Sequence, residues 1–424
     1  MSARRRLAVV GGGWAGIAAA VEATLRGHNV HLFEMAPQLG GRARSFTVDG
    51  IEIDNGQHIA IGAYAETLAL LARVGIEPAR AFLRLPLRLV DPDGVGLRLR
   101  PGAPSLAFAA AVLAHPTWRW DDKLGLLGSA AGWAARGFRC DPAWTVQRLA
   151  SRLSPVVQRE LIEPLCVAAL NTEAGAASAG VFLRVLKDAL FSGPGASDLL
   201  LPRLPLSGVL AGPAGDWLRA AGADLRLGHR AMTLQPRAGG WDLDGVAVDG
   251  VILASTATEA ARLALDIAPA WSQSTHALAW EPIVTVYAHG DAADLDEPML
   301  ALEAGPSAPA QFAFNRGRLG GPPGLLAFVV SGARDWVARG ADATWVAVQR
   351  QAQVQLAPQG VGSLRRLKTV VEHRATFRCV PGLTRPAMTI GPNLLAAGDY
   401  VDGPYPATLE GAVRSGIAAA RHFG

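Results

Sequence analysis

The pattern of apolar and polar positions predicts a strand, a helix and a second strand at the start of the chain. An apolar run over residues 7–10 ends in a glycine-rich stretch, and an alanine-rich helical stretch then continues to Arg26 and stops at Gly27. A second apolar run over residues 30–33 ends at Glu34. These elements together span about thirty residues, which is typical of two parallel strands joined by a helix.

The rest of the chain predicts two interleaved domains of an α/β protein. Alternation around turn residues indicates hairpins over residues 46–53 and 85–99, whereas residues 104–190 have a helical pattern. Strand patterns dominate residues 282–330. We expect one discontinuous domain to comprise residues 1–60, 206–265 and 381–424, and the other to comprise residues 61–205 and 266–380, with a helical insert at about 103–200.

The composition of the 424 residues excludes several classes of protein. Half of the residues are hydrophobic and 18% are charged, which excludes a disordered chain and a coiled coil. The formal net charge of +4 is too small for a typical nucleic-acid-binding surface, so we expect no nucleic-acid partner. The three cysteines, at 140, 166 and 379, are far apart and form no Cys-x-x-Cys pair. We therefore expect no disulfide framework, no metal site and a reducing, cytoplasmic compartment.

Two segments raise the question of a membrane. The arginines at 4–6 and the apolar stretch after them resemble a secretory signal, but the same stretch fits a nucleotide-binding turn better. No apolar run reaches the roughly 18 residues of a membrane-spanning helix. Residues 103–139 suit two buried helices with a polar loop between them. Alternatively they form a flap whose Trp118, Trp120 and Trp133 lie at headgroup level, which would give peripheral contact with the inner face of the cytoplasmic membrane.

A glycine pattern between the first predicted strand and helix indicates a dinucleotide site. Gly11-x-Gly13-x-x-Gly16 follows the strand, and Glu34 ends the next strand 18 residues after Gly16. Gly11 permits a tight turn, Gly13 lets the backbone approach a pyrophosphate, and Gly16 allows close packing of helix on strand. Glu34 would accept from a ribose hydroxyl and repel a 2′-phosphate, which favours FAD or NAD over NADP. The flanking residues Trp14, Ala15 and Met35 are further candidate cofactor contacts.

A second glycine pair lies close behind the acidic residue and favours FAD. Gly40, Gly41 and Arg42 belong to the stretch Leu-Gly-Gly-Arg-Ala-Arg-Ser, whose arginines add anion-binding capacity. This arrangement resembles the FAD-dependent amine oxidases and carotenoid desaturases, which share a glycine turn, an acidic residue and a Gly-Gly-Arg-x-x-Ser block. The resemblance implies a Rossmann-like FAD-binding domain of the glutathione-reductase type and an α+β substrate domain. It also implies that residues 54–58, which include Gln57, run beside the flavin ring.

The C-terminal end of the chain agrees with the same resemblance. An apolar strand precedes Gly398 and Asp399, and a helix of small residues begins near Thr408 and Leu409. In the flavoproteins that this stretch resembles, the turn holds the ribityl–phosphate chain. The helix N-terminus there points at the flavin pyrimidine and stabilises the reduced, anionic ring. The resemblance also implies that Met232 and the three residues before it form a strand on the adenine side.

Within that family, the sequence is most similar to the bacterial hydroxysqualene dehydroxylases. Amine oxidases usually have a lysine in a strand over the flavin, whereas the matching stretch here, residues 280–287, contains none. The blocks at 372–377 and 406–416 resemble those of the dehydroxylases, and the similarity extends over essentially the whole chain. There are two departures: His373 stands where a lysine is expected, and residues 400–405 replace a more usual Trp-Thr-x-Thr-Gly-Leu run.

This resemblance implies reductive removal of an allylic hydroxyl from hydroxysqualene, which gives squalene for hopanoid synthesis. The reaction would pass through an allylic cation that takes a hydride from flavin N5. The resemblance places His58, Asp54, Asp402 and Tyr405 near the ring as candidate acids for the leaving hydroxyl, and His58 is the first candidate. We expect the long-chain isoprenoid substrate to occupy an apolar tunnel built by the helical insert.

Two alternatives stay open at the level of sequence. One is a carotenoid or squalene desaturase, which would oxidise a polyisoprene. The other is a flavin-binding scaffold that associates with squalene-pathway synthases and catalyses nothing. No second dinucleotide fingerprint occurs in the chain, so we expect the external reductant to be NADPH that visits the flavin site, or a reduced-flavin or other electron-transfer donor.

Overall fold

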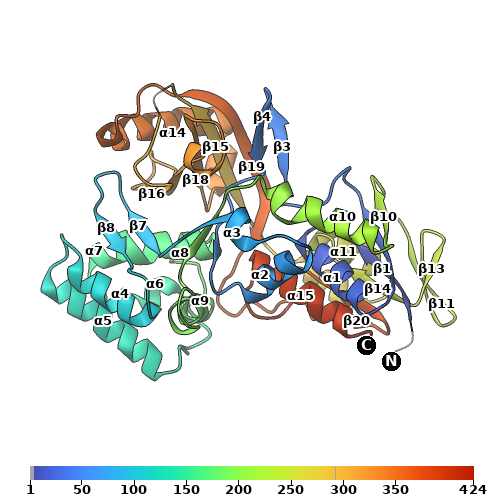
Figure 1. The fold of residues 1–424 in the computed structure, drawn as a ribbon. Coiled ribbons are helices and arrows are strands. Elements are labelled where there is room, and N and C mark those ends of the chain that lie inside the picture. The colour runs from blue at the N-terminus through green and yellow to red at the C-terminus, as the bar shows by residue number, and fades with distance from the viewer. Residues whose placement is uncertain (1–3, 292) are drawn as a thin grey trace.

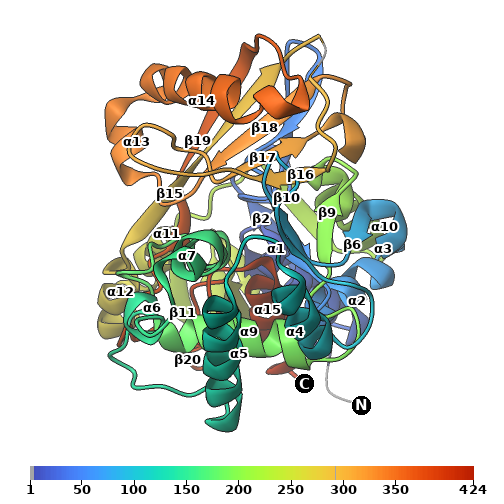
Figure 2. The ribbon, with the colours of Figure 1, turned by 90° about the vertical axis from the view of Figure 1, so that its left-hand side faces the viewer.

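A computed structural model describes residues 4–291 and 293–424, which form an α/β fold built on two main sheets (Figures 1 and 2). The larger sheet has six strands, which are, in order across it, β10 (Asp224–Leu227), β2 (Asn29–Glu34), β1 (Arg6–Val10), β14 (Gly250–Leu253), β21 (Leu394–Ala396) and β20 (Thr389–Gly391). The first five strands are parallel and β20 is antiparallel. The predicted α/β class is therefore confirmed, and the sheet takes its strands from three separate parts of the chain.

Both faces of this sheet are buried, which explains why its central strand is a continuous apolar run. Leu7 and Val9 pack toward the helices α1 (Trp14–Leu25), α10 (Gly212–Ala220) and α15 (Leu409–Arg421). Ala8 and Val10 point to the opposite face, as the two-residue period of a strand requires. That face is covered by a three-stranded sheet and two helices: β11 (Leu234–Arg237), β12 (Gly240–Leu243), β13 (Val246–Val248), α11 (Ala257–Ala264) and α12 (Pro269–His276).

The second main sheet is antiparallel and lies beside the first. Its strands in order are β16 (Met299–Ala301), β17 (Phe312–Asn315), β18 (Leu325–Val330), β15 (Trp280–His289) and β19 (Arg365–Phe377). The helices α13 (Arg334–Arg339) and α14 (Ala341–Gln355) cover its outer face, where Val286 and Phe328 meet Val348. The opposite face, with Thr285 and Val370, lines the cavity described below.

The predicted helical insert is present and lies at one edge of the molecule (Figure 1). Its elements are α4 (Pro104–Ala114), α5 (Trp120–Ala135), α6 (Val146–Leu149), α7 (Pro155–Val157), a π-helical segment (Gln158–Ile162), α8 (Glu163–Leu170) and α9 (Ala179–Phe191). The predicted flap, in which three tryptophans lie at the headgroup level of a membrane, is wrong. Trp118 and Trp133 are each only 5% exposed, and the Trp118 indole N–H donates to Glu160, so only Trp120 faces outward.

Small elements connect these regions. Both predicted hairpins are present, as β3 (Ser45–Val48) with β4 (Ile51–Asp54), and β7 (Arg88–Val90) with β8 (Gly96–Arg98). The remaining elements are β5 (Ala60–Ile61), β6 (Phe82–Leu85), β9 (Leu199–Pro202), α2 (Ala65–Arg73), α3 (Pro78–Ala81), a second π-helical segment (Ser207–Ala211) and two 3-10 turns (Gly317–Leu319 and Ala357–Gln359). Among the described residues, none of the helices has the length and apolar character needed to cross a membrane. The exact domain boundaries stay a prediction.

Candidate functional site

A single cavity of about 860 Å³ joins the carboxyl ends of the parallel strands to the inner face of the antiparallel sheet. Val10, Glu34 and Ala254 line it where β1, β2 and β14 end, and Thr285 and Glu372 line it from the other sheet. Ligands of open α/β sheets bind outside the carboxyl ends of the strands. The position therefore suits a cofactor, and the cavity has two parts, a glycine-lined cradle and an apolar arm.

The glycines of the first turn shape the cradle in the way that the sequence predicts. Gly11 has φ +109°, and a Cβ there would lie 2.6 Å from the carbonyl oxygen of Ala254. A Cβ at Gly16 would lie 1.8 Å from the carbonyl oxygen of Gly11, so Gly16 packs the helix against the turn and does not line the cavity. Gly13 differs, because its nearest neighbour would be 3.9 Å away and the space beside it belongs to the cavity. The turn thus keeps its backbone open to a ligand at Gly13.

Glu34 is buried at the end of β2 and is held in place by backbone N–H groups. Its Oε2 accepts from the N–H of Gly12 at 2.6 Å, and its Oε1 accepts from that of Ala36 at 2.7 Å. Each carboxylate oxygen keeps lone pairs for a further donor. The side chain lines the cavity with its neighbour Met35, as expected for an acceptor of a ribose hydroxyl.

The second glycine pair closes over the first turn. The N–H of Gly40 donates to the carbonyl of Gly12 at 2.8 Å, and a Cβ at Gly41 would lie 3.0 Å from the Cα of Gly13. The Arg42 guanidinium pairs with the Asp399 carboxylate at 2.6 Å. Burial opposes the charge of this guanidinium, but the Asp399 carboxylate raises the pKa of Arg42 above its usual value. Both glycine stretches and the C-terminal turn therefore meet at one place.

The C-terminal helix begins at the cavity. Thr408 caps α15 by accepting from the N–H of Gly411 at 3.0 Å, and both Thr408 and Leu409 line the cavity. Gly398 also lines it, and its N–H donates to the hydroxyl of Ser415 at 2.8 Å. The N-terminal end of a helix carries partial positive charge, so this arrangement favours an anionic group in the cavity.

The cavity walls contain polar atoms that lack partners. Within the described part of the chain, Trp14 Nε1, Thr285 Oγ1 and the Tyr400 hydroxyl are buried without a hydrogen-bond partner, and all three residues line this cavity. Buried polar groups are normally hydrogen-bonded, so three such atoms around one cavity indicate a polar ligand. A flavin nucleotide, with ring, ribityl and phosphate acceptors, fits these atoms, the open turn at Gly13 and the helix end at Thr408.

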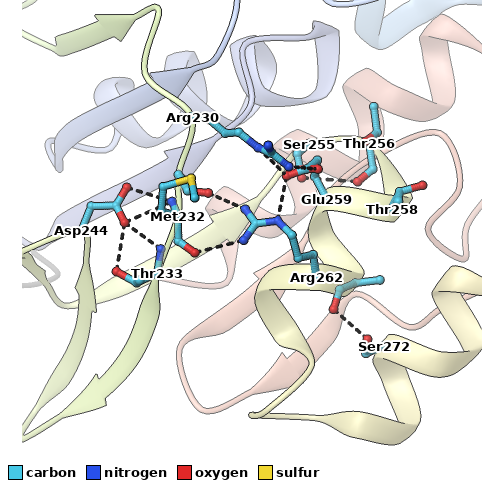
Figure 3. A network of polar contacts seen from close by, with 12 residues as sticks. Arg230, Met232, Thr233, Asp244, Ser255, Thr256, Thr258, Glu259, Arg262 and Ser272 are labelled. Carbon is cyan, nitrogen blue, oxygen red and sulfur yellow. Dashed lines mark hydrogen bonds and ion pairs between the residues drawn. The ribbon is translucent and has the colours of Figure 1, made fainter.

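The prediction of a strand ending in Met232 is wrong. Residues 228–233 run irregularly between β10 and β11, and the Met232 side chain is 58% exposed and does not line the cavity. Figure 3 shows the reason: side chains, and not a neighbouring strand, form hydrogen bonds with the backbone of this segment. Arg262 donates to the Ala231 and Met232 carbonyls, and Asp244 accepts from the N–H of Met232. Ala231 still lines the cavity, so the segment borders the site with a different residue.

The apolar arm extends from the cradle into the helical insert. Figure 2 shows α4, α5 and α9 at the front of the molecule, below the antiparallel sheet. The walls of the arm are mainly hydrocarbon and come from the insert helices and the antiparallel sheet. They include Phe108, Leu165, Phe182, Val185, Leu186, Leu199, Ile283, Met299 and Phe312. An arm of this composition would accept a long hydrocarbon.

Two of the four predicted acids lie outside the cavity. Asp54 is buried behind it, where its Oδ1 accepts from the Ser45 hydroxyl at 2.7 Å and from the Leu206 N–H at 2.9 Å. Asp402 points outward and pairs with Arg385 at 3.0 Å. Asp54 is thus held by groups of the chain itself, and Asp402 lies away from the cavity. His58 and Tyr405 do line the cavity.

Burial changes the protonation of His58. Desolvation lowers the pKa of His58 below its usual value of 6.5, although Asp54 and the Gly56 carbonyl oppose this shift. The imidazole is therefore neutral near pH 7, and its Nδ1 lies 3.3 Å from the Gly56 carbonyl oxygen. Gln57, the neighbour of His58 on the cavity wall, donates to the Tyr287 hydroxyl at 2.9 Å. A neutral histidine is a poor proton donor.

Tyr405 lies in a cluster of charged groups at the wall of the arm. Its backbone has φ +60°, which is rare for a side chain of this size. Burial raises the pKa of Tyr405 above its usual value of 10, and the nearby Asp188 carboxylate adds to the shift. The guanidinium groups of Arg184 and Arg414 lie 5.8 and 5.0 Å from the centre of the Tyr405 ring. Asp188 in turn binds Arg184 at 2.7 Å.

Sequence reasoning missed three residues of the cavity wall. Asp188 is a buried carboxylate on α9, and its neighbours Arg184 and Lys187 made it look like part of an exposed polar stretch. Tyr64 stands edge-on to Tyr405, with ring centres 5.9 Å apart. Thr285 occupies the strand in which amine oxidases have their lysine. Tyr64 and Thr285 gave no signal, because only the fold brings them to the cavity.

Comparison with known proteins decides the family. The family described as flavin containing amine oxidoreductase matches residues 14–422. The chain belongs to this family. It is thus an FAD-dependent oxidoreductase. A hydroxysqualene dehydroxylase of Rhodopseudomonas palustris is 30% identical, over 97% of this chain and 96% of that protein.

Two further comparisons concern a curated relative and the fold. A hydroxysqualene dehydroxylase of Sinorhizobium fredii is 28% identical, over 97% of this chain and 96% of that protein. Among solved structures, an oxidoreductase from Methanosarcina mazei has a TM-score of 0.72 at 16% identity, with 98% of this chain and 100% of that one covered. The last comparison concerns the fold alone. The predicted family and fold class are confirmed.

Proposed function

We propose that this flavin oxidoreductase removes the allylic hydroxyl of hydroxysqualene reductively and releases squalene, a precursor for hopanoid synthesis. The observation that carries the proposal is the continuity of one cavity, which runs from the glycine cradle into an apolar arm in the helical insert. The names of the two similar dehydroxylases support the same assignment. Bound FAD in its reduced state would supply a hydride to the substrate carbon that loses its hydroxyl.

The residues of the chain then have three tasks. The arm, with side chains such as Phe182 and Val185, would hold the hydrocarbon and exclude water from the carbon that becomes positively charged. The start of α15 at Thr408 would stabilise negative charge on the bound cofactor. The third task is to protonate the departing hydroxyl, since hydroxide is a poor leaving group.

Tyr405 is our proposed proton donor. Tyr405 lines the cavity and keeps its proton at neutral pH, whereas burial lowers the pKa of His58, so its imidazole is neutral there. When the Tyr405 hydroxyl gives up its proton, the guanidinium groups of Arg184 and Arg414 beside its ring would stabilise the phenolate. Asp188 holds Arg184 in place through the 2.7 Å contact, so Asp188 is a positioning residue. This assignment replaces His58 as the first candidate.

An anaerobic experiment tests the direction of the reaction. The flavoprotein is reduced chemically, mixed with hydroxysqualene without oxygen, and the lipid is identified by mass spectrometry. Squalene formed with reoxidation of the flavin supports reductive dehydroxylation. Reduction of oxidised flavin by squalene or phytoene, without dehydroxylation, would instead assign the protein as a desaturase.

The same preparation tests the two remaining parts of the proposal. NADPH and reduced flavin mononucleotide are each supplied in turn, and the donor that sustains turnover identifies the class of physiological reductant. A protein that binds flavin yet reacts with neither hydroxysqualene, squalene nor phytoene would fit a scaffold for isoprenoid synthases.

A further inference from the structure

The helices α4 and α5 expose an apolar face that no other part of the described chain covers. On α4 the exposed positions follow a helical spacing, and α5 repeats the pattern. We call these positions the insert face: Leu106, Ala110, Leu113 and Ala114 of α4, and Trp120, Leu124, Ala131 and Ala135 of α5. Leu106 is 73% exposed and Trp120 is 65% exposed. An exposed helix face in a water-soluble domain is ordinarily polar.

The inner faces of the same helices are firmly packed, so the insert face is not a displaced piece of the core. Val112 is fully buried, Leu126 is 1% exposed and Trp133 is 5% exposed. The Lys123 ammonium also turns inward, where it donates to the Leu113 carbonyl at 2.9 Å. Only one charged residue, Asp121, is exposed on the two helices. The apolar side chains therefore point outward while both helices are held in place.

Positive charge flanks the insert face at both ends of α5. Arg119 precedes the helix, and Arg136 and Arg139 follow it, all three exposed. In residues 4–291 and 293–424, none of these three guanidinium groups forms an ion pair with a carboxylate. An apolar face with a tryptophan and basic residues at its borders is the composition that binds the interface of an anionic bilayer.

The helix α4, which carries part of the insert face, also lines the apolar arm. Phe108 of α4 lines the cavity, two residues from the outward Leu106, and Leu190 of α9 lines it beside Phe191, which is 52% exposed. The helices α4 and α9 pack against each other. A bilayer bound at this face would thus lie directly above the helices that enclose the arm, and Figures 1 and 2 show that α5 projects from the body of the molecule there.

We propose that the insert face binds the surface of an anionic lipid bilayer, with Leu106, Leu113, Trp120 and Leu124 embedded among the acyl chains. The described helices are too short to cross the bilayer, so the contact is interfacial. This contact would let an apolar alcohol pass between the bilayer and the arm, and that role rests on the proposed function. The binding itself does not depend on the identity of the substrate.

Vesicle flotation of the flavin-loaded protein tests the proposal. The vesicles contain phosphatidylcholine, with or without phosphatidylglycerol. We expect flotation with the anionic vesicles, and at least a tenfold weaker association for the double variant Leu106→Glu/Trp120→Glu. The matched control is Val346→Glu/Val354→Glu on α14, which places two carboxylates on exposed valines elsewhere and should change binding less than about twofold. The double variant Arg136→Glu/Arg139→Glu should abolish the preference for anionic vesicles.

Three results would overturn the proposal. Wild-type protein that does not float is one, and equal loss of flotation in the α14 control is another. The third is a dimer in light scattering that only Leu106→Glu/Trp120→Glu dissociates, without vesicle binding by the wild type, because the face would then bind a second copy of the chain. Unchanged flavin absorbance and circular dichroism show that each variant is folded. Turnover of hydroxysqualene in detergent is measured separately, so vesicle binding without turnover contradicts the proposed function and supports the insert face.

Discussion

The two parts of the cavity differ in how the chain builds them. The cradle is made of backbone: Gly11, Gly13 and Gly41 meet there, and a Cβ at Gly11 or Gly16 would strike a carbonyl oxygen. The apolar arm is made of side chains from separate helices and strands, such as Phe182 and Phe312. Glycines at fixed spacings leave a motif in the sequence, whereas an apolar wall can be built from many combinations of residues.

Because they differ in this way, the two parts of the cavity suit different ligands. The cradle offers N–H groups, a helix N-terminus and a buried carboxylate, which suit a cofactor common to a large family. The arm offers hydrocarbon and the charged cluster around Tyr405, which suit one class of substrate. A substitution in the cradle should therefore remove flavin, and a substitution in the arm should leave flavin bound but impair the substrate or its protonation.

The largest effect is expected for Gly13→Glu. A Cβ at Gly13 meets nothing closer than 3.9 Å, so the protein should fold, while the carboxylate would occupy the cradle and repel a pyrophosphate. We expect loss of flavin by more than about a thousandfold in affinity, measured by absorbance of the refolded or purified protein. Gly362→Glu, at an exposed glycine with open space, is the matched control and should bind flavin normally. Stoichiometric flavin in folded Gly13→Glu contradicts the placement of the cradle.

The next largest effect is expected for Tyr405→Phe. Loss of the proton donor should lower turnover about a hundredfold, because general acid catalysis contributes at least this much. The flavin spectrum should stay unchanged. Tyr64→Phe removes the neighbouring hydroxyl, 5.9 Å away between ring centres, and should keep turnover within about tenfold of the wild type. Equal losses in both variants would mean that packing, and not proton donation, explains the effect.

A smaller effect is expected for Val185→Asp in the arm. A carboxylate among hydrocarbon side chains would bind water and repel an apolar chain, so KM for hydroxysqualene should rise about thirtyfold. Lys187→Asp, on the exposed side of the same helix, is the control and should leave KM unchanged. Flavin affinity should be equal in both variants. A Val185→Asp protein with wild-type KM would show that the substrate lies elsewhere.

The smallest effect is expected for pH. A proton donor must be protonated, and the pKa of Tyr405 is raised above 10, so turnover should vary less than about twofold from pH 6.5 to 9. The pKa of His58 is lowered below 6.5, so the protonated fraction of a His58 donor would keep falling as the pH rises across this range. Single-turnover rates across this range distinguish the two residues. A fall of about tenfold per pH unit would return His58 to the role of donor.

Much of the cradle could be predicted from the sequence because its constraints are local. Gly11, Gly13 and Glu34 have their roles through spacing along two strands and one turn. A clash with the Ala254 carbonyl explains Gly11, whereas open space toward the cavity explains Gly13. The Met232 strand failed because Asp244 and Arg262 satisfy its backbone from other segments, which no local pattern reveals.

The catalytic groups could be predicted less well because tertiary contacts set their chemistry. The sequence offers Asp54 and Asp402 as candidate proton donors. In the structure Asp54 accepts from the Ser45 hydroxyl, and Asp402 pairs with Arg385. Burial makes His58 neutral, and this depends on walls contributed by distant segments. Trp118 illustrates the same limit, since its indole is buried against Glu160 and does not face outward.

The most direct measurement is rapid mixing of the anaerobically reduced flavoprotein with hydroxysqualene, with the flavin absorbance and the lipid followed in the same sample. If the reduced cofactor in the cradle faces a substrate held in the arm, one squalene should form for each flavin reoxidised, at a rate that saturates with substrate. Flavin that stays reduced while hydroxysqualene remains intact would contradict this account.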